Sequence, residues 1–197
     1  HLSHAVENVH WIRREDGGLA CYLAGWAYLR KVDLGQHEQT VTVLLRDPAT
    51  GAEHAFEATE KPASSYPPPR DDLWCDYRPG RFGVEVDLAA LVAAGDASWE
   101  VWLRVEAAGL VAERPVTRLI RSGAAGHIPA LTLGRGRSVI ADWSYQQVLR
   151  LRSDSGGAAL VRLALSDGVL SGTVAAADLA RVGRVTLSAG RRVVEAR

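Results

Sequence analysis

The feature that most constrains the fold is an apolar, aromatic run at residues 20–34, Ala-Cys-Tyr-Leu-Ala-Gly-Trp-Ala-Tyr-Leu-Arg-Lys-Val-Asp-Leu. The run is too short to span a bilayer, and its aromatic residues favour a strand over a helix. Alternate positions point to opposite faces of a strand, and both sets are apolar here. We therefore predict a central strand that is covered on both faces and ends in a turn at residues 32–35, with Trp26 and Tyr28 in core or inter-domain packing.

Short apolar or alternating runs, separated by turn residues, continue along the chain. An Asp-Gly-Gly turn joins residues 6–12 to 19–29, and Asp-Pro-Ala-Thr-Gly joins 40–46 to 52–58, so each pair predicts a β-hairpin. A short helical turn is predicted at residues 88–94. Further strands are predicted at residues 82–88, 99–106, 128–133, 138–143, 148–152, 159–165, 169–174, 185–189 and 191–196. Short strands at this spacing indicate an all-β sandwich or barrel.

A break with proline and several glycines at residues 114–126 divides these runs. A chain of 197 residues can hold one domain or two small ones. We predict two β-sandwich domains, residues 1–118 and residues 119–197.

Trp102 stands out on the strand predicted at residues 99–106. The apolar face of that strand is formed by Trp99, Val101, Leu103 and Val105, whereas Trp102 alternates with Glu100, Arg104 and Glu106. A large apolar residue on a charged face needs a cover. We predict that Trp102 packs on the second domain or on a partner chain, and the alternative is that it stacks a sugar.

The segment at residues 61–81 contains five prolines, with Tyr66, Trp74 and Tyr77 between them. Proline at this density excludes the interior of a sheet, and the aromatic residues argue against disorder. Two interpretations stay open for these rings. They stack neutral sugars, or Trp74 and Tyr77 close one end of the sandwich core.

Three carboxylates, Asp71, Asp72 and Asp76, lie among these aromatic residues. Paired acids beside aromatic residues are typical of glycosidases, but acids also cap and solvate loops. No second acid from a distant segment can be identified, so a stand-alone glycosidase is the least favoured function.

The net charge of zero hides an asymmetry between the two halves. Residues 1–118 contain 12 Arg and Lys against 18 Asp and Glu, whereas residues 119–197 contain 11 Arg against 5 acids. The two halves either complement each other or the second one binds an anionic partner. The candidate anion-binding residues are Arg135, Arg137, Arg150, Arg152, Arg191 and Arg192.

The sequence lacks the motifs of several common sites. The six histidines show no ligand spacing and no Cys-x-x-Cys occurs, so no metal site is predicted. A nucleophile elbow, a phosphate loop and a dinucleotide fingerprint are missing, so we predict no catalytic residue and no cofactor. No nucleic-acid motif is present, so no nucleic-acid partner is predicted. Cys21 and Cys75 are predicted to be buried or half-buried thiols.

Four stretches carry a family likeness. They are Leu-Ala-Gly-Trp-Ala-Tyr-Leu-Arg-Lys-Val-Asp-Leu at residues 23–34, Thr-Val-Thr-Val-Leu-Leu-Arg-Asp at 40–47, Phe-Gly-Val-Glu-Val-Asp-Leu-Ala-Ala-Leu at 82–91 and Trp-Glu-Val-Trp-Leu-Arg-Val-Glu-Ala at 99–107. Over residues 6–118 the chain resembles the tandem immunoglobulin-like accessory domains of teichoic-acid-type glycosyltransferases and CDP-glycerol glycerophosphotransferases, which are common in actinobacteria. Beyond residue 118 the likeness rests on the order and spacing of the strands.

The resemblance implies two tandem immunoglobulin-like β-sandwich domains with a non-catalytic role, the active site lying elsewhere in a longer transferase. The absence of methionine fits a segment of a longer protein. Implied partners are the parent transferase domain, further copies of the chain, and an anionic wall polymer or anionic membrane surface. The implied location is the cytoplasm, including the inner face of the plasma membrane. The alternative function is a carbohydrate-binding module that stacks sugars on Trp74, Tyr77 or Trp102.

Overall fold

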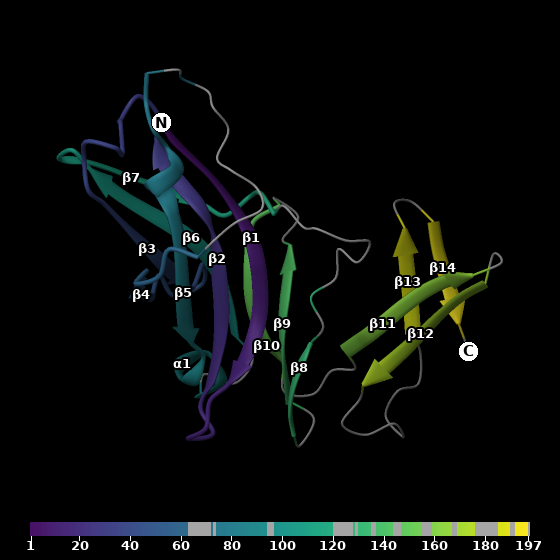
Figure 1. The fold of residues 1–197 in the computed structure, drawn as a ribbon. Coiled ribbons are helices and arrows are strands. Elements are labelled where there is room, and N and C mark those ends of the chain that lie inside the picture. The colour runs from purple at the N-terminus through teal and green to yellow at the C-terminus, as the bar shows by residue number, and fades with distance from the viewer. Residues whose placement is uncertain are drawn as a thin grey trace.

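The computed structural model describes residues 1–62, 72, 74–93, 97–119, 128, 130–134, 137–143, 147–154, 159–166, 169–175, 185–189 and 192–196. Nearly all of the described elements are strands (Figure 1). The predicted all-β sandwich fold is therefore confirmed.

The described strands form two principal sheets. The three-strand sheet has the antiparallel order β1 (Leu2–Arg13), β2 (Leu19–Leu29) and β5 (Arg81–Asp87). The large sheet has the order β4 (Glu53–Glu57), β3 (Gln39–Arg46), β6 (Ala97–Ala107), β10 (Leu149–Asp154), β9 (Arg137–Trp143) and β8 (Leu131–Gly134), with β7 (Leu110–Pro115) also paired to β6.

Four strands at the C-terminal end pair in two separate antiparallel hairpins (Figure 1). They are β11 (Ala159–Ser166) with β12 (Val169–Ala175), and β13 (Val185–Ala189) with β14 (Arg192–Ala196). The helical elements that the structure describes are short, namely η1 (Arg78–Gly80) and α1 (Ala89–Ala93). The strand positions match the predicted runs closely, and α1 falls inside the predicted helical turn.

The core lies between the two principal sheets. On β5, alternation places Phe82, Val84 and Val86 on the buried face, as their period-two spacing predicts. On β6, Leu103 and its apolar neighbours at alternate positions are likewise buried. Side chains of both sheets join in one hydrophobic cluster that extends to β9 and β10. Because burial follows the alternation, the opposite face of each sheet is left for other contacts.

Strand β2 is covered on both faces, as its sequence predicts. Leu23 is buried on the core face, and Trp26 and Tyr28 are buried on the outer face. A bulge lies in β1 opposite this stretch, between Val6 and Asn8. There the backbone of β1 approaches β2 so closely that a Cβ on Gly25 would lie 2.1 Å from the Ala5 carbonyl oxygen. Glycine is required at this point for the close approach of the two strands.

One edge of β6 is shared by two strands. Strand β7 pairs with residues 102–107 of β6, and β10 pairs with residues 97–100 of the same edge. Val116 lies at the junction, where its N–H donates to the Val101 carbonyl and its carbonyl accepts from Leu149. Strand β7 was not predicted from the sequence. The division into domains at residues 118 and 119 stays a prediction, and the large sheet contains strands from both sides of it.

Candidate functional site

Three aromatic rings stack on the outer face of the three-strand sheet. The Tyr28 and Tyr77 rings lie 4.0 Å apart, and Trp26 stacks on Tyr28 with 5.5 Å between centroids. The Tyr77 hydroxyl accepts a hydrogen bond of 2.9 Å from the Lys31 N–H, and burial raises the pKa of Tyr77 to about 12. Tyr77 therefore packs on the outer face of this sheet, which is not the predicted position at one end of the core, and its ring is buried.

Trp74 lies in the same segment but has the opposite environment. Its side chain is 90% exposed, so it does not close the end of the core. Its backbone N–H donates to the Asp72 carboxylate at 3.1 Å. Among the described residues, Trp74 is the aromatic residue with both ring faces open to a ligand.

The described acids of this segment stabilise local turns through hydrogen bonds and an ion pair. Asp72 accepts the Trp74 N–H, and Asp76 forms an ion pair of 2.6 Å with Arg78. Asp33 in turn accepts the Asp76 N–H at 2.8 Å, and this bond, together with one from the Gly35 N–H, lowers the pKa of Asp33. These contacts explain the acids as capping groups, so the described part of the segment lends no support to a glycosidase.

Trp102 lies half-buried on the outer face of the large sheet, within a set of charged residues. Leu44, its register partner on β3, is fully buried on the same face. The Arg46 guanidinium lies 4.7 Å from the centre of the Trp102 ring, within the range of a cation–π contact. The Trp102 indole N–H donates to Glu100 at 3.2 Å. The ring is thus covered in part by an arginine of its own sheet.

Ion pairs connect these residues into what we call the Trp102 network, formed by Trp102, Arg46, Glu53, Glu113, Arg104, Glu100 and Arg150. Arg46 pairs with Glu53 at 2.5 Å and with Glu113 at 2.6 Å. Glu113 also accepts from Arg104 at 2.6 Å, and the hydrogen bonds from Arg46 and Arg104 lower the pKa of Glu113. Five strands, β3, β4, β6, β7 and β10, contribute side chains to this network.

The structure brings two of the predicted anion-binding arginines onto this same face. Arg150 lies opposite Glu100 in the β10–β6 register and pairs with it at 2.9 Å. Arg152 pairs with Asp142 at 3.8 Å. Arg137 donates instead to the Val92 carbonyl at the end of α1. Each of these three arginines therefore already has an acceptor, and the contact of Arg152 is the longest of the three.

Several predicted site residues cannot be located. Tyr66, Asp71, Arg135 and Arg191 lie outside the described residues, and only the backbone of Arg192 is described.

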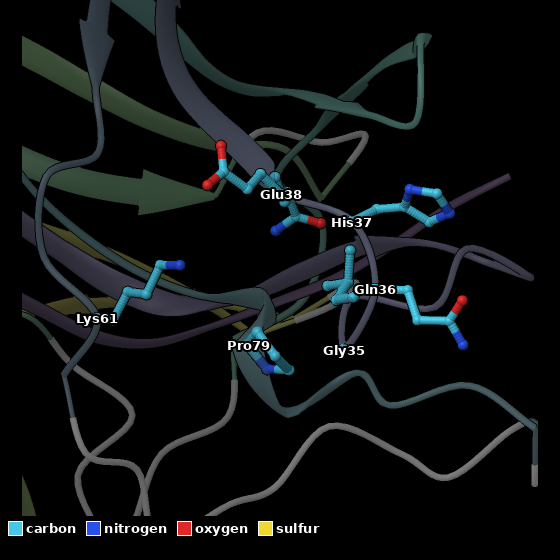
Figure 2. Close-up of a pocket in the computed structure, with 8 residues that line it drawn as sticks. Gly35, Gln36, His37, Glu38, Lys61 and Pro79 are labelled. Atoms are coloured by element: carbon cyan, nitrogen blue, oxygen red, sulfur yellow. The ribbon is translucent and has the colours of Figure 1, made fainter.

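A polar cavity that the sequence did not reveal opens beside the turn that follows β2. It has a volume of about 230 Å³ and is bounded by residues 34–39, Lys61 and Pro79. Figure 2 shows the Glu38 and Lys61 side chains on one side of it, with Gln36 and His37 directed away from them. The lining comes from three separate segments, and no local motif marks it.

The scan of family models finds no match, and no curated protein matches the sequence. The fold, however, resembles that of S. aureus TarS. With the structure of S. aureus TarS the TM-score is 0.50 at 10% identity, covering 83% of this chain and 26% of that one. With the structure of S. aureus TarS 217–571 the TM-score is 0.52 at 10% identity, covering 88% of this chain and 45% of that one.

TarS is a teichoic-acid glycosyltransferase. The present chain spans less than half of either TarS chain, and at this identity the likeness shows the fold alone. The match to TarS 217–571 covers 88% of the 197 residues of this chain, which is more than residues 1–118 alone could supply. The likeness therefore also includes part of residues 119–197.

Proposed function

We propose that this chain is a non-catalytic accessory module of a cell-wall-polymer glycosyltransferase or glycerophosphotransferase. There it mediates oligomerisation or positions the catalytic domain. The observation that carries the proposal is the likeness of its β-sandwich fold to TarS over most of the chain. The described acids support a non-catalytic role, because Asp72 and Asp76 cap turns.

The face around the Trp102 network is the surface proposed for contact with the transferase domain or with another copy of the chain. Tryptophan and arginine are enriched at the centres of protein interfaces, and ion pairs that are satisfied internally lower the cost of removing them from water. Here Trp102 is half-buried, and Arg46, Arg104 and Arg150 each have a carboxylate partner. A protein partner fits this charge-balanced face better than an anionic polymer does.

Contact with an anionic polymer or membrane surface is the subsidiary part of the proposal. Arg152 is the described arginine that best fits this role, since its side chain is half-exposed and its pair with Asp142 is long. Among the described residues, no helical segment has the length and apolar character needed to cross a bilayer. At the inner face of the plasma membrane, the anionic lipid surface is the partner that this part of the proposal expects.

Light scattering after size exclusion tests the oligomer. The expected result is a mass that is a multiple of the single-chain mass and that falls to one chain in Trp102→Ala. Trp74→Ala, which alters an exposed ring outside the network, is the matched control and should leave the mass unchanged. A wild-type chain that stays monomeric at high concentration contradicts the oligomer part. Transfer activity of the isolated chain would contradict the non-catalytic part.

Sugar stacking on Trp74 is a second candidate function. It is favoured by the 90% exposure of this ring, because flat exposed aromatic surfaces bind the apolar faces of sugars. Isothermal titration calorimetry should then show binding of neutral oligosaccharides that is insensitive to salt, and Trp74→Phe should retain part of the affinity. Binding that persists in Trp74→Ala would assign the sugar to another site.

A further inference from the structure

The outer face of the large sheet has an ordered charge pattern that the strand register sets. Residues that lie opposite each other on neighbouring strands share a face, so each register position forms a row across the sheet. One such row crosses five strands, and the charges along it alternate in sign. It consists of Glu53, Arg46, Glu100, Arg150 and Asp142. Each arginine in this row therefore has a carboxylate on either side.

The next row along the strands is apolar. It consists of Ala55, Leu44, Trp102 and Pro115. Leu44 is fully buried, and the half-buried Trp102 ring lies under the Arg46 guanidinium. The row beyond it contains Arg104 opposite Glu113, which form an ion pair of 2.6 Å. The face thus has an apolar centre between two charged rows, as protein interfaces commonly have.

The charge pattern selects the kind of partner. An anionic polymer needs cations that are free to bind it, but Arg46, Arg104 and Arg150 each pair with a carboxylate at 2.9 Å or less. A protein that complements alternating signs must itself carry alternating signs. The same face on a second copy of the chain meets this condition, because the charges at Glu100 and Arg104, on either side of Trp102, are opposite.

We propose that this face binds the same face of a second copy of the chain, with a two-fold axis along the Trp102 row. The axis exchanges the two charged rows, so Glu100 lies opposite the second copy's Arg104, and Arg150 lies opposite its Glu113. Trp102 lies opposite its own counterpart at the centre, where aromatic anchors of interfaces often meet. The inference rests on the oligomer part of the proposed function and specifies the partner and the contact.

One pairing of like charges results from this arrangement. Glu53 and Glu57 of the two copies face each other, because they lie on either side of the axis on β4. Both residues are exposed on the edge strand of the sheet. There solvent and salt screen like charges, and the twist between stacked sheets displaces edge strands more than central ones. The favourable contacts lie on or beside the central strand β6.

Charge reversal on the two sides of the axis tests the proposal. Glu100→Arg places a cation opposite the second copy's Arg104, and Arg104→Glu places an anion opposite the second copy's Glu100. Each variant alone should dimerise about tenfold more weakly or worse, since like charges across an interface repel. An equimolar mixture of the two should regain the dimer mass in light scattering, because both contacts then join opposite charges.

The matched control is a mixture of Glu100→Arg with Arg46→Glu. These two positions are neighbours within one chain but do not face each other across the axis, so this mixture should stay monomeric. Circular dichroism checks that each variant is folded.

Cross-linking provides a second measurement that leaves the charges intact. Ala55 is exposed on the Trp102 row, so the axis places it near its counterpart. In a Cys75→Ser background, a short bismaleimide should join two Ala55→Cys chains. Ala49→Cys, in the exposed turn between β3 and β4, should not be joined, because the axis moves this turn to the far end of the strand in the second copy.

The outcomes separate this inference from the proposed function. A multimeric wild type whose mass is unchanged in both charge-reversal variants overturns the inference and leaves the oligomer part standing. Recovery with Arg46→Glu in place of Arg104→Glu overturns the axis proposed here. If the charge variants do not fold, the cross-link decides, and equal cross-linking through Ala55→Cys and Ala49→Cys overturns the inference. A chain that is monomeric alone but binds the transferase domain through Trp102 assigns the face to that domain instead.

Discussion

Trp26 and Trp102 both lie on outer sheet faces, but their side chains are buried to very different extents. Trp26 is 1% exposed, because Tyr28 stacks beside it and Arg118 lies over its ring at 5.7 Å. Trp102 is covered in part by Arg46 and stays half-buried. Both residues occupy strands whose other face belongs to the core. The difference lies in the cover, which is a chain segment for Trp26 and charged side chains for Trp102.

One outer face is thus covered by a chain segment, whereas the other is covered only by side chains of its own sheet. The cover of Trp26 is held in place by the segment 116–119, which runs along β1: the Val6 N–H donates to the Arg118 carbonyl, and the Thr117 N–H donates to His4. Ion-paired side chains can move aside for a partner at a lower cost than a hydrogen-bonded segment can.

The largest expected effect comes from removing the covered ring. Trp26→Ala should lower the free energy of unfolding by about 3–5 kcal/mol, the usual cost of deleting a buried aromatic side chain. Urea denaturation followed by circular dichroism measures the loss. A cost below that of Trp102→Ala would contradict the assignment of Trp26 to the structural face.

The second-largest effect is expected from acidification, which should destabilise the contact between His4 and the segment that covers Trp26. Burial, with Arg114 and Arg118 nearby, lowers the pKa of His4 from 6.5 to about 4. As the pH falls, the unfolded chain therefore takes up a proton on His4 before the folded chain does. The free energy of unfolding that neutral His4 contributes is fully present above pH 6.5 and is lost as the pH falls towards 4. The loss approaches about 3 kcal/mol if the shift is expressed in full.

The pH dependence is measured by urea denaturation at a series of pH values. His4→Gln should flatten the curve in this window, and His10→Gln, a change at an exposed position of the same strand, should leave it as it is. An unchanged curve in His4→Gln would assign the acid sensitivity to other groups.

A smaller effect is expected from Trp102→Ala. The ring is half-buried and its contact with Arg46 is worth about 0.5–1 kcal/mol. We therefore expect a destabilisation of about 1–2 kcal/mol from lost area and lost cation–π contact together. The same variant should have its main effect on the oligomeric mass. A large loss of stability without a change in mass would mark this face as structural too.

The smallest effect is expected from Glu113→Gln. Arg46 and Arg104 lose their shared carboxylate, but partly exposed ion pairs contribute only about 0.2–1 kcal/mol each. The loss measured by urea denaturation should shrink at high salt, since salt screens such pairs. A loss of stability that does not depend on salt would show that Glu113 contributes through packing and not through its charge.

Much of the sandwich could be predicted because alternation is a local property. The sequence around β6 predicted which face Trp102 occupies, and two-sided apolarity predicted the double cover of β2. Strand β7 was not identified, because its residues lie beside the expected domain break. Its hairpin turn, where Ala108 and Gly109 both have positive φ, is marked only by a single glycine.

The sites depended on information that no local pattern carries. Tyr77 and Trp74 are three residues apart in one segment, yet one is buried and the other exposed, because only Tyr77 meets the Tyr28 ring. The polar cavity beside the turn after β2 is lined by residues 34–39, Lys61 and Pro79, which lie far apart in the sequence. Such pairings follow from the tertiary fold and not from spacing along the chain.

The shared edge of β6 also constrains how the chain reaches its fold. The β6–β7 hairpin is local and can form early, whereas β10 must close a loop of some fifty residues to reach residues 97–100. Until it does, four residues of backbone donors and acceptors stay open beside a finished hairpin. A protein cut at residue 118 would keep that gap permanently, and an open strand edge recruits strands from other molecules. Pairing with β10 therefore closes an edge that residues 1–118 alone would leave open.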